Sequence, residues 1–515
     1  MTASPDREDF MADAFRALLD ALSALSGVLV GVLLLAIAAL VAGAWLADHR
    51  QTQHAIRRNF PLLGRARYGL EHLGTFLRPY FFAMDREEMP FNRAQRSWVY
   101  RAAKNLDNTA GFGSTKNLAA PGAVTFLNAP FPELHSDSAE TRALRIGPHC
   151  RTPFDAPHFF NVSGMSYGAL SKVAVEALSR GAREAGCWMN TGEGGLSSWH
   201  LAGGCDLVFQ IGTAKYGVRD EAGRLSLPRL RDVAAHEPVR MFEVKLSQGA
   251  KPGKGGILPA HKVTAEIAAI RGIPEGQASL SPNRHPEISS VGELLDFVAR
   301  VRDATGKPCG VKFVVGTSAW LVRLCDEIHR RGPESAPDFL TVDSGDGGTG
   351  AAPLPLIDDV GLLLRESLPL VVDTLVEAGL RERVRVVASG KLVTPTEVAT
   401  ALAMGADFCV TARGFMFSIG CIQALQCNRN TCPTGVTTHD PRLQRGLVPA
   451  DKAERVRHYH GNLVREVEVI AHACGVADPR DLRRHHVRVM TDSGKSMPLS
   501  VLYPDAEPVR LLERA

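Results

Sequence analysis

Short apolar runs, rich in β-branched and aromatic residues, recur along the middle of the chain and end in turns rich in Gly, Ser or Asn. Runs of this length, bounded by turn residues, are typical of buried β-strands. The pattern predicts eight strands: Phe159–Ser163, Trp188–Thr191, Leu207–Ile211, Met241–Leu246, Gly310–Val315, Phe339–Asp343, Val384–Ala388 and Phe408–Thr411.

Helical periodicity fills several intervals between these strands, as in Lys172–Ala185, Val291–Arg302 and Thr396–Ala403. Strands that alternate with helices indicate a parallel sheet. Eight such units over about 300 residues predict an α/β protein with a (β/α)8 TIM barrel. An open doubly wound sheet is the alternative, but it is expected to carry an early Gly-x-Gly-x-x-Gly turn, which this sequence lacks.

The N-terminal segment has a different pattern, because no charged side chain occurs from Ala21 to Ala47. About 20 apolar residues suffice to cross a bilayer, so we expect a transmembrane helix at about residues 22–47. The alternatives are a signal peptide, which usually has a basic start and a shorter apolar stretch, and a buried helix, which is rarely apolar on every face. Five arginines follow the stretch, so the positive-inside rule predicts a single-pass protein with a cytoplasmic catalytic domain: Arg50, Arg57, Arg58, Arg65 and Arg67.

These patterns divide the chain into four parts. Residues 1–48 form the anchor, 49–150 a folded collar, 151–450 the barrel, and 451–515 a tail. The tail is predicted to be helical because apolar residues recur at helical spacing among charges from Lys452 to Cys474.

Composition and charge indicate a globular protein and argue against nucleic-acid binding. Hydrophobic residues make up 45% and charged residues 22%, which is ordinary for a globular protein. The net charge of +4 is small for 515 residues, so a nucleic-acid partner is not expected. The ten cysteines are mostly scattered, as in a reduced cytosolic protein, except where three cluster.

Three glycine-rich turns follow the late strands: Ser344–Gly350, Ala388–Lys391 and Thr411–Gly414. Glycine lets a backbone approach a ligand closely, and successive N–H groups can hold a phosphate. The loops after strands 7 and 8 are the usual phosphate site of such barrels. A plain tight turn explains any one of them, but together they favour a phosphate-bearing ligand.

Cys421, Cys427 and Cys432 have a C-x5-C-x4-C spacing, and Pro433 follows the last one. A proline directly after a ligand cysteine is familiar in iron–sulfur proteins. Structural zinc usually takes four ligands from C-x2-C pairs, so three close thiolates favour a cluster over zinc. Three buried cysteines without a ligand are the alternative interpretation.

Two groups of lysines are also notable. Lys312 lies within an apolar strand, where burial is costly unless an anion is near. In a barrel that binds a flavin, it could face the edge of the ring that gains negative charge on reduction. Alternatively, it could extend to water at the barrel mouth. The loop at residues 245–256 combines Lys245, Lys251 and Lys254 with glycines and could present cations to a dicarboxylate.

Together these segments resemble the FMN-binding synthase domain of glutamate synthase, and the anchored front end resembles the shorter stand-alone members of that family. The similarity covers roughly residues 150–445. It is carried by Gly164–Ser171, Asn190–Gly195, Lys245–Gly256, His261–Val263, Asp346–Pro353, and Gly420-Cys421 through Cys432-Pro433.

The resemblance implies FMN, a [3Fe–4S] cluster held by Cys421, Cys427 and Cys432, and reductive amination of 2-oxoglutarate to glutamate. It also implies catalytic roles for Glu193, Lys245 and Lys251, with Glu193 near the arriving ammonia. The keto acid would be bound by Lys245, Gln248, Lys251 and Arg271. The residues implied for FMN are Met165, Ser166, Gln210, Lys312, Gly347, Gly348, Thr349, Gly350, Ser389, Gly390, Arg413 and Gly414.

The sequence departs from the family pattern in two segments. In the first, Ile257 replaces a glutamine that helps to hold the keto acid, and Lys254 replaces a glutamate. In the second, the family's Ser-Gly-His-Asp-Gly-Gly is here Asp343-Ser344-Gly345-Asp346-Gly347-Gly348. Loss of a polar partner can change substrate preference by orders of magnitude. The alternatives are therefore a flavin and iron–sulfur oxidoreductase for another amine or 2-hydroxy acid, and a membrane-docked electron-relay subunit.

Two modules of the large glutamate synthases are not evident in the sequence. Without an N-terminal cysteine nucleophile, ammonia is expected to be free or to come from a separate glutaminase. Without a Gly-x-Gly-x-x-Gly module for NAD(P)H, electrons are expected from another protein, ferredoxin-like or membrane-bound.

Overall fold

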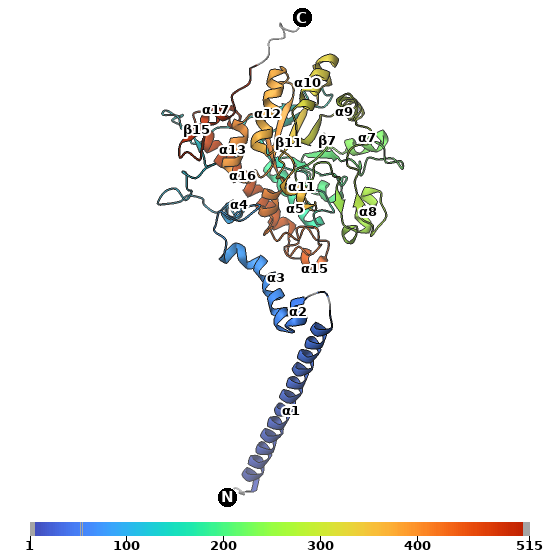
Figure 1. Cartoon of the computed structure of the whole chain (residues 1–515), viewed down its shortest axis with the longest axis vertical. Helices are drawn as coiled ribbons and strands as arrows, with labels where there is room; N and C mark the ends of the chain where they lie inside the picture. Colours follow the sequence, from blue (N-terminus) through green and yellow to red (C-terminus); the bar gives the residue numbers. More distant parts are fainter. Residues whose placement is uncertain (1–5, 52, 54, 508–515) are drawn as a thin grey trace. The chain divides into compact units, whose positions relative to one another are not determined.

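A computed structural model describes residues 6–51, 53 and 55–507 of the chain. The fold divides into two compact units, Met1–Arg93 and Ala94–Ala515. Figure 1 shows the elements of both.

The first unit is dominated by α1, Asp6–Arg50, followed by α2, Ala55–Asn59, and α3, Leu63–Phe81. The helix expected at residues 22–47 is therefore present and begins earlier. The stretch Phe10–Arg50 reaches a mean hydropathy of 2.8, and none of that window is buried. A membrane anchor and a signal sequence share these properties. At its end the buried Asp48 carboxylate accepts bonds from Arg57 and Arg65, each at 2.7 Å.

The second unit contains a closed barrel of eight strands, in which every neighbouring pair is parallel. This confirms the predicted (β/α)8 fold. Each of the eight predicted runs contributes one strand. The strands are β4 (Phe160–Val162), β5 (Met189–Asn190), β6 (Leu207–Ile211), β7 (Val239–Lys245), β10 (Cys309–Val314), β11 (Phe339–Asp343), β12 (Arg385–Ser389) and β13 (Phe408–Thr411).

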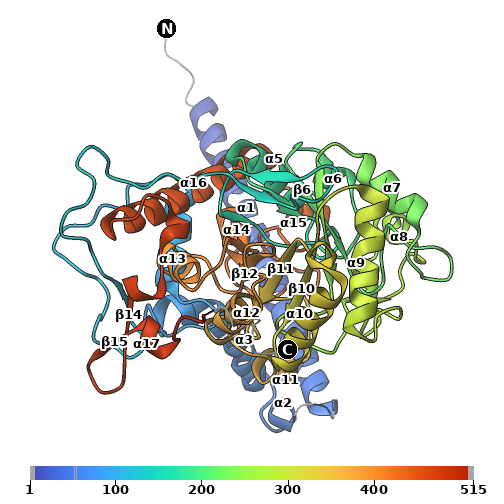
Figure 2. The same ribbon diagram turned by 90° about the horizontal axis from the view of Figure 1, so that it is seen from above.

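Helices surround the barrel, as Figure 2 shows from above. Ser171 and Ser290 begin two of them by accepting a bond from the backbone N–H three residues on, which satisfies a donor that the first turn leaves free. The helices are α4 (Arg93–Ala103), α5 (Lys172–Ala185), α6 (Ser198–Leu201), α7 (Leu227–Ala235), α8 (Ala265–Arg271), α9 (Val291–Thr305), α10 (Ala319–Arg331), α11 (Leu354–Asp358), α12 (Leu364–Glu377), α13 (Pro395–Ala403), α14 (Arg413–Ser418) and α15 (Pro441–Gln444).

The tail returns to the barrel through α16, Pro449–Ala473, which confirms its predicted helix. At Gly181 of α5, an added Cβ would lie 2.4 Å from Val456 of α16, so glycine permits this close helix crossing. The tail also contains elements that periodicity did not predict. β14 (Val487–Met490) pairs with β15 (Ser496–Pro498) and with β1 (Val124–Phe126), and α17 (Leu499–Leu502) follows.

Two hairpins and several short turns complete the fold. β2 (Leu144–Ile146) and β3 (Phe154–Ala156) place Ile146 and Phe154 against the buried Trp188 and Phe408 in the barrel core. β8 (Ile257–Leu258) pairs with β9 (Ser279–Leu280) within the long segment after β7. The 3-10 turns are η1 (Ala260–Lys262), η2 (Pro333–Ser335), η3 (Pro479–Asp481) and η4 (Arg484–His486).

Candidate functional site

The end of β7 brings together the side chains predicted to act on a substrate. Lys245 is the last residue of this strand, and its Nζ lies 3.1 Å from Oε2 of Glu193 in the loop after β5. The same ammonium donates to Oε1 of Gln248. Strand register also sets Lys245 beside Lys312 of β10. The predicted residues therefore converge at the carboxyl ends of the strands, where barrel enzymes carry their active sites.

Two further cations are buried here without a carboxylate partner in the described part of the chain. Lys251 is 4% exposed, and its Nζ donates only to the carbonyl of Ala351, at 3.3 Å. Arg271 is 5% exposed and donates to Ser279 Oγ at 3.0 Å, while its guanidinium lies over the Tyr216 ring. A buried cation is costly unless an anion balances it. These two positions are therefore suited to a negatively charged ligand.

The charges in this group act on one another. Burial raises the pKa of Glu193, but Lys245, Lys251 and Arg271 outweigh that effect, so the pKa is lowered and the carboxylate stays ionised. Burial lowers the pKa of Lys251 to about 8, and Glu193 opposes that change. Lys251 consequently loses its proton closer to neutral pH than an ordinary lysine does.

Asp343, at the end of β11, connects the neighbouring loops. Its Oδ1 accepts a bond from Ser389 Oγ at 2.6 Å, and its Oδ2 accepts one from the backbone N–H of Gly249 at 2.8 Å. Lys312 Nζ lies 3.6 Å from the same carboxylate. Asp343 thus positions two predicted flavin residues, Lys312 and Ser389, and is a residue for which sequence patterns predict no role. Its place at the end of a buried strand was the available signal.

The glycine-rich loop after β11 lies against Arg413, which follows β13. Arg413 donates to the carbonyl of Asp346 at 3.4 Å, and burial lowers its pKa to about 10. A Cβ at Gly348 would lie 2.9 Å from Arg413 Nε, so glycine leaves room for this side chain. Gly347 is buried while Gly348 and Gly350 are exposed, with Thr349 between them. Gly390 and Gly414 follow β12 and β13, so all three predicted phosphate loops lie at the same end of the barrel.

The loop after β4 carries Met165 and Ser166, and it packs against the loop after β5. A Cβ at Gly192 would lie 2.6 Å from Ser166 N. Met165 is buried, and its carbonyl lies 3.4 Å from Nε2 of His200. This contact fixes the backbone of the loop that was predicted to hold the flavin.

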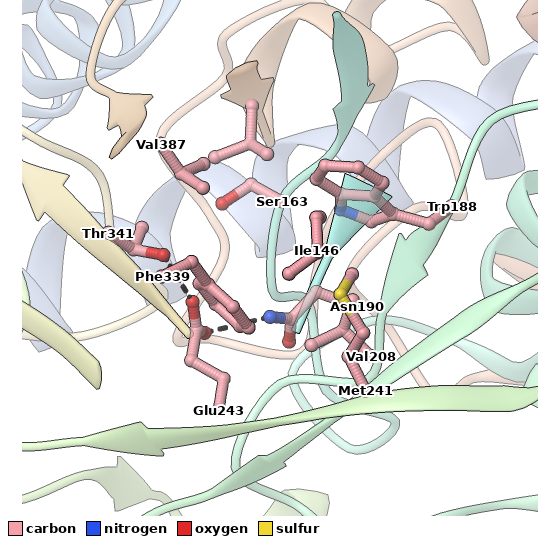
Figure 3. A pocket seen from close by; sticks show the side chains of 11 residues that line it. Ile146, Ser163, Trp188, Asn190, Val208, Met241, Glu243, Phe339, Thr341 and Val387 are labelled. Carbon is pink, nitrogen blue, oxygen red and sulfur yellow. Dashed lines mark hydrogen bonds between the residues drawn. The ribbon is translucent and has the colours of Figure 1, made fainter. Parts of the chain in front are cut away.

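The amide of Gln210, another predicted flavin residue, belongs to a polar cluster inside the barrel. Its amide donates to Glu243 Oε1 at 2.7 Å, and Asn190 donates to the same oxygen at 2.8 Å. Thr341 donates to the other oxygen at 2.6 Å, and Figure 3 shows the Asn190 and Thr341 contacts beside a cavity of about 20 Å³. Sequence reasoning missed Glu243, whose burial within an apolar strand was the signal. A space of this size can hold about one water molecule.

Cys421, Cys427 and Cys432 lie in one loop after α14. Burial raises the pKa of Cys421 to about 12. Burial also acts to raise the pKa of Cys432, but hydrogen bonding to Thr434 and Thr437 together outweighs it, so that pKa is lowered. Among the described residues, no group of three His, Cys, Asp or Glu side chains is arranged to hold a metal ion. The Thr437 hydroxyl is buried beside Cys427 and Cys432 without a well-aligned partner. A sulfur-rich group spanning the thiols would supply an acceptor for it.

The cysteine loop is tied to the loop after β4. Lys262 of η1 donates to the carbonyls of Ala169 and Cys427, at 2.7 and 3.2 Å. His439 Nε2 lies 2.9 Å from the carbonyl oxygen of Gly168. The structure therefore brings the cysteines close to the loop of Met165 and Ser166, and neither Lys262 nor His439 had been assigned a role.

Fold and site together define a (β/α)8-barrel protein whose mouth is suited to anions. Solved structures with similar folds include a mandelate oxidase mutant with an FMN adduct, at 17% identity and a TM-score of 0.39, covering 82% of this chain and 99% of that one. A mutant flavocytochrome b2 with benzoylformate has 14% identity and a TM-score of 0.44, covering 89% of this chain and 95% of that one. At these identities the similarity concerns the fold alone.

Sequence comparison identifies the family. The conserved region of glutamate synthase matches residues 116–477. The chain is 39% identical to a glutamate synthase large subunit-like protein of Bacillus subtilis, over 92% of this chain and 96% of that one. It is 33% identical to an archaeal glutamate synthase (NADPH) of Methanocaldococcus jannaschii, over 64% of this chain and 61% of that one. The chain belongs to the glutamate synthase family of oxidoreductases.

Proposed function

We propose that this protein is an FMN-dependent oxidoreductase that reductively aminates 2-oxoglutarate, or a related 2-keto acid, to the amino acid. The observation that carries the proposal is the pair of buried cations, Lys251 and Arg271, beside Glu193 and Lys245. A dicarboxylic keto acid would balance their charge. Family membership supports the reaction class.

The side chains suit the binding of such an acid and the handling of its protons. Lys251 and Arg271 would bind its carboxylates, while Lys245 and Gln248 would orient the keto group. Glu193 is ionised, so it could accept a proton from ammonium at the site and release ammonia as the nucleophile. Ammonia would displace water from the keto carbon to give an imine, whose carbon then takes a hydride and whose nitrogen takes a proton.

The cofactor residues are consistent with FMN. Met165, Ser166 and Gln210 would line the flavin, Lys312 would face its reducible edge, and Arg413 with the glycine-rich loops would hold the phosphate. Those loops include Gly347, Gly348, Thr349, Gly350, Ser389, Gly390 and Gly414. When bound and reduced, FMN supplies the hydride.

Cys421, Cys427 and Cys432 would hold a [3Fe–4S] cluster, which supplies electrons singly. The pattern of three cysteines in one loop, with the buried Thr437 hydroxyl beside two of them, supports this assignment. We further propose that electrons come from a ferredoxin-like or membrane-bound protein. Ammonia would be free or would come from a separate glutaminase.

We also propose that α1 anchors the protein in a membrane with the barrel in the cytoplasm. Its apolar surface is long enough to span a bilayer. The following α3 supports an interfacial position, because Leu70 and Phe81 are exposed and Arg67 and Arg78 lie on the same helix. Such amphipathic helices lie at membrane surfaces.

The test is an anaerobic flavin assay on the full chain in detergent. Flavin is reduced with dithionite, and its absorbance is followed after addition of 2-oxoglutarate and ammonium. Reoxidation that requires both compounds and yields glutamate is the expected result. Flavin that stays reduced after addition of both 2-oxoglutarate and ammonium would overturn the proposal for 2-oxoglutarate.

Two lysine variants test whether Lys251 binds the keto acid directly. Lys251→Ala should raise the KM for the keto acid by about tenfold to a hundredfold, because a hydrogen bond to a charged group contributes about 1.5–3 kcal/mol. Lys254→Ala, an exposed position in the same loop, should change it little. Equal effects of the two substitutions would argue against a direct role for Lys251.

Ile257 favours a second candidate, in which the substrate is a 2-hydroxy acid with a less polar side chain, oxidised to a 2-keto acid as the flavin is reduced. Ile257 is partly exposed in β8 and pairs with Leu280. An apolar residue offers no hydrogen bond to a distal carboxylate. Anaerobic reduction of the oxidised flavin by a monocarboxylic 2-hydroxy acid would support this candidate.

A further inference from the structure

A short turn outside the barrel holds the cysteine loop by two consecutive side chains. In η1, His261 Nε2 lies 3.1 Å from the carbonyl oxygen of Asn428, and Lys262 Nζ lies 3.2 Å from that of Cys427. Because η1 belongs to the segment between Lys251 and Arg271, the substrate segment and the cysteine loop are joined directly.

Lys262 is the more unusual of the two residues. Its side chain is 1% exposed, and its second bond goes to the carbonyl of Ala169 in the loop after β4. Among the residues that the structure describes, no carboxylate forms an ion pair with it. Both of its acceptors are neutral carbonyls, so the protein itself leaves this buried charge unbalanced. Such a charge is expected to face an anion.

The nearby groups that can become anionic are sulfur atoms. The thiols of Cys427 and Cys432 both act electrostatically on the Lys262 ammonium. The buried Arg96 of α4 acts electrostatically on Cys421, and Tyr100 of α4 donates to the carbonyl of Cys421 at 2.7 Å. Cations from two separate elements therefore act on the three thiols.

We propose that Lys262 is a positioning residue that supplies the counter-charge of the iron–sulfur cluster and ties it to the flavin loop. This inference rests on the cluster assigned in the proposed function. Three thiolates carry negative charge, and reduction adds one electron more. A buried cation stabilises the reduced form more than the oxidised form, and thus raises the reduction potential.

The experiment compares three variants of the full chain. Lys262→Met removes the charge and keeps the length, Lys262→Arg keeps the charge, and Lys254→Met changes an exposed lysine of the preceding loop. Iron and acid-labile sulfide are measured first. The midpoint potential of the cluster is then measured by anaerobic titration with electron paramagnetic resonance detection, without substrate.

Lys262→Met should shift the reduced-to-oxidised ratio at a fixed potential by about tenfold toward the oxidised form, which is about 59 mV for one electron. Lys262→Arg should restore most of the ratio, and Lys254→Met should leave it unchanged. Cluster loss in Lys262→Met with retention in Lys262→Arg would also support the charge role.

Two results would overturn the inference. One is an unchanged potential in Lys262→Met with full iron content. The other is equal loss of iron in Lys262→Met and Lys262→Arg, since it would mean that shape and not charge matters there. Absence of iron in the unmodified protein would instead overturn the cluster assignment itself, which separates the two failures.

Discussion

At the scale of single residues, the site depends on cations that the fold buries without balancing them. Lys251 and Arg271 gain no carboxylate partner among the described residues, while Lys245 is paired with Glu193. All three cations help to keep Glu193 ionised, but Lys251 and Arg271 form no ion pair with it in the described part of the chain and can bind a ligand. Lys245, Lys251, Arg271 and Glu193 all carry full charges, so their charge alone does not distinguish them. Their different roles follow from where the fold places each side chain.

The lowered pKa of Lys251, about 8, makes acid binding depend on pH. The ammonium is protonated below that value and loses its proton as pH rises through it, so affinity for 2-oxoglutarate should fall above about pH 8. Lys251→Arg should keep its affinity to higher pH, because a guanidinium remains protonated. Equilibrium binding to the oxidised protein between about pH 6.5 and 9.5, without ammonia, measures this. Identical pH curves for the two proteins would contradict it.

At the scale of elements, the loop after β11 and the start of α14 must fit together. The Arg413 side chain occupies the space that a Cβ at Gly348 would need. A similar Cβ at Gly350 would meet nothing within 4 Å. Gly348 is therefore needed to leave room for the Arg413 side chain, whereas Gly350 is not.

Gly348→Ala should weaken FMN binding by displacing Arg413, with little loss of folding stability because a flexible side chain can move aside. Gly350→Ala should bind FMN almost normally. Fluorescence titration of the apoprotein with FMN, together with thermal unfolding, separates the two effects. Equal flavin affinity in both variants would show that Arg413 does not depend on Gly348.

The cysteine loop offers a second prediction at this scale. Cys427→Ser should abolish the cluster, because serine is a poor ligand for iron, while FMN stays bound to its own loops. Cys474→Ser, which changes a buried thiol of the tail, is the matched control. Iron and flavin content of the purified proteins measure the outcome. Unchanged iron in Cys427→Ser would rule out the assignment.

At the scale of the whole molecule, α1 should keep the protein in the membrane. The protein should remain in the pellet after an alkaline carbonate wash, and its intact mass should include residues 1–50. Protease should digest the barrel in inverted vesicles and leave it intact in spheroplasts, because the arginines after α1 favour the cytoplasm. A soluble protein that lacks α1 would indicate a cleaved signal sequence.

The sequence alone determined the barrel strands and the main helices. The eight strands, the helix Lys172–Ala185 and the long apolar helix follow from local patterns, because alternation, capping residues and hydropathy act over a few neighbouring residues. The positions of the cysteines along the sequence also placed all three in one loop. The positions of the glycines placed the glycine-rich turns after the last strands. Eight strand and helix units were sufficient to predict the barrel.

Only the tertiary structure decided which of these residues meet. Barrel closure places Glu193 beside Lys245 and lets Asp343 bind both Ser389 and Gly249. Folding of the long segment after β7 brings Lys262 to the cysteine loop 165 residues away. Sequence periodicity carries no information about such pairs, because their geometry is set by strand register and loop packing across the whole chain. The tertiary structure therefore decides which charged side chains of the site form ion pairs and which do not.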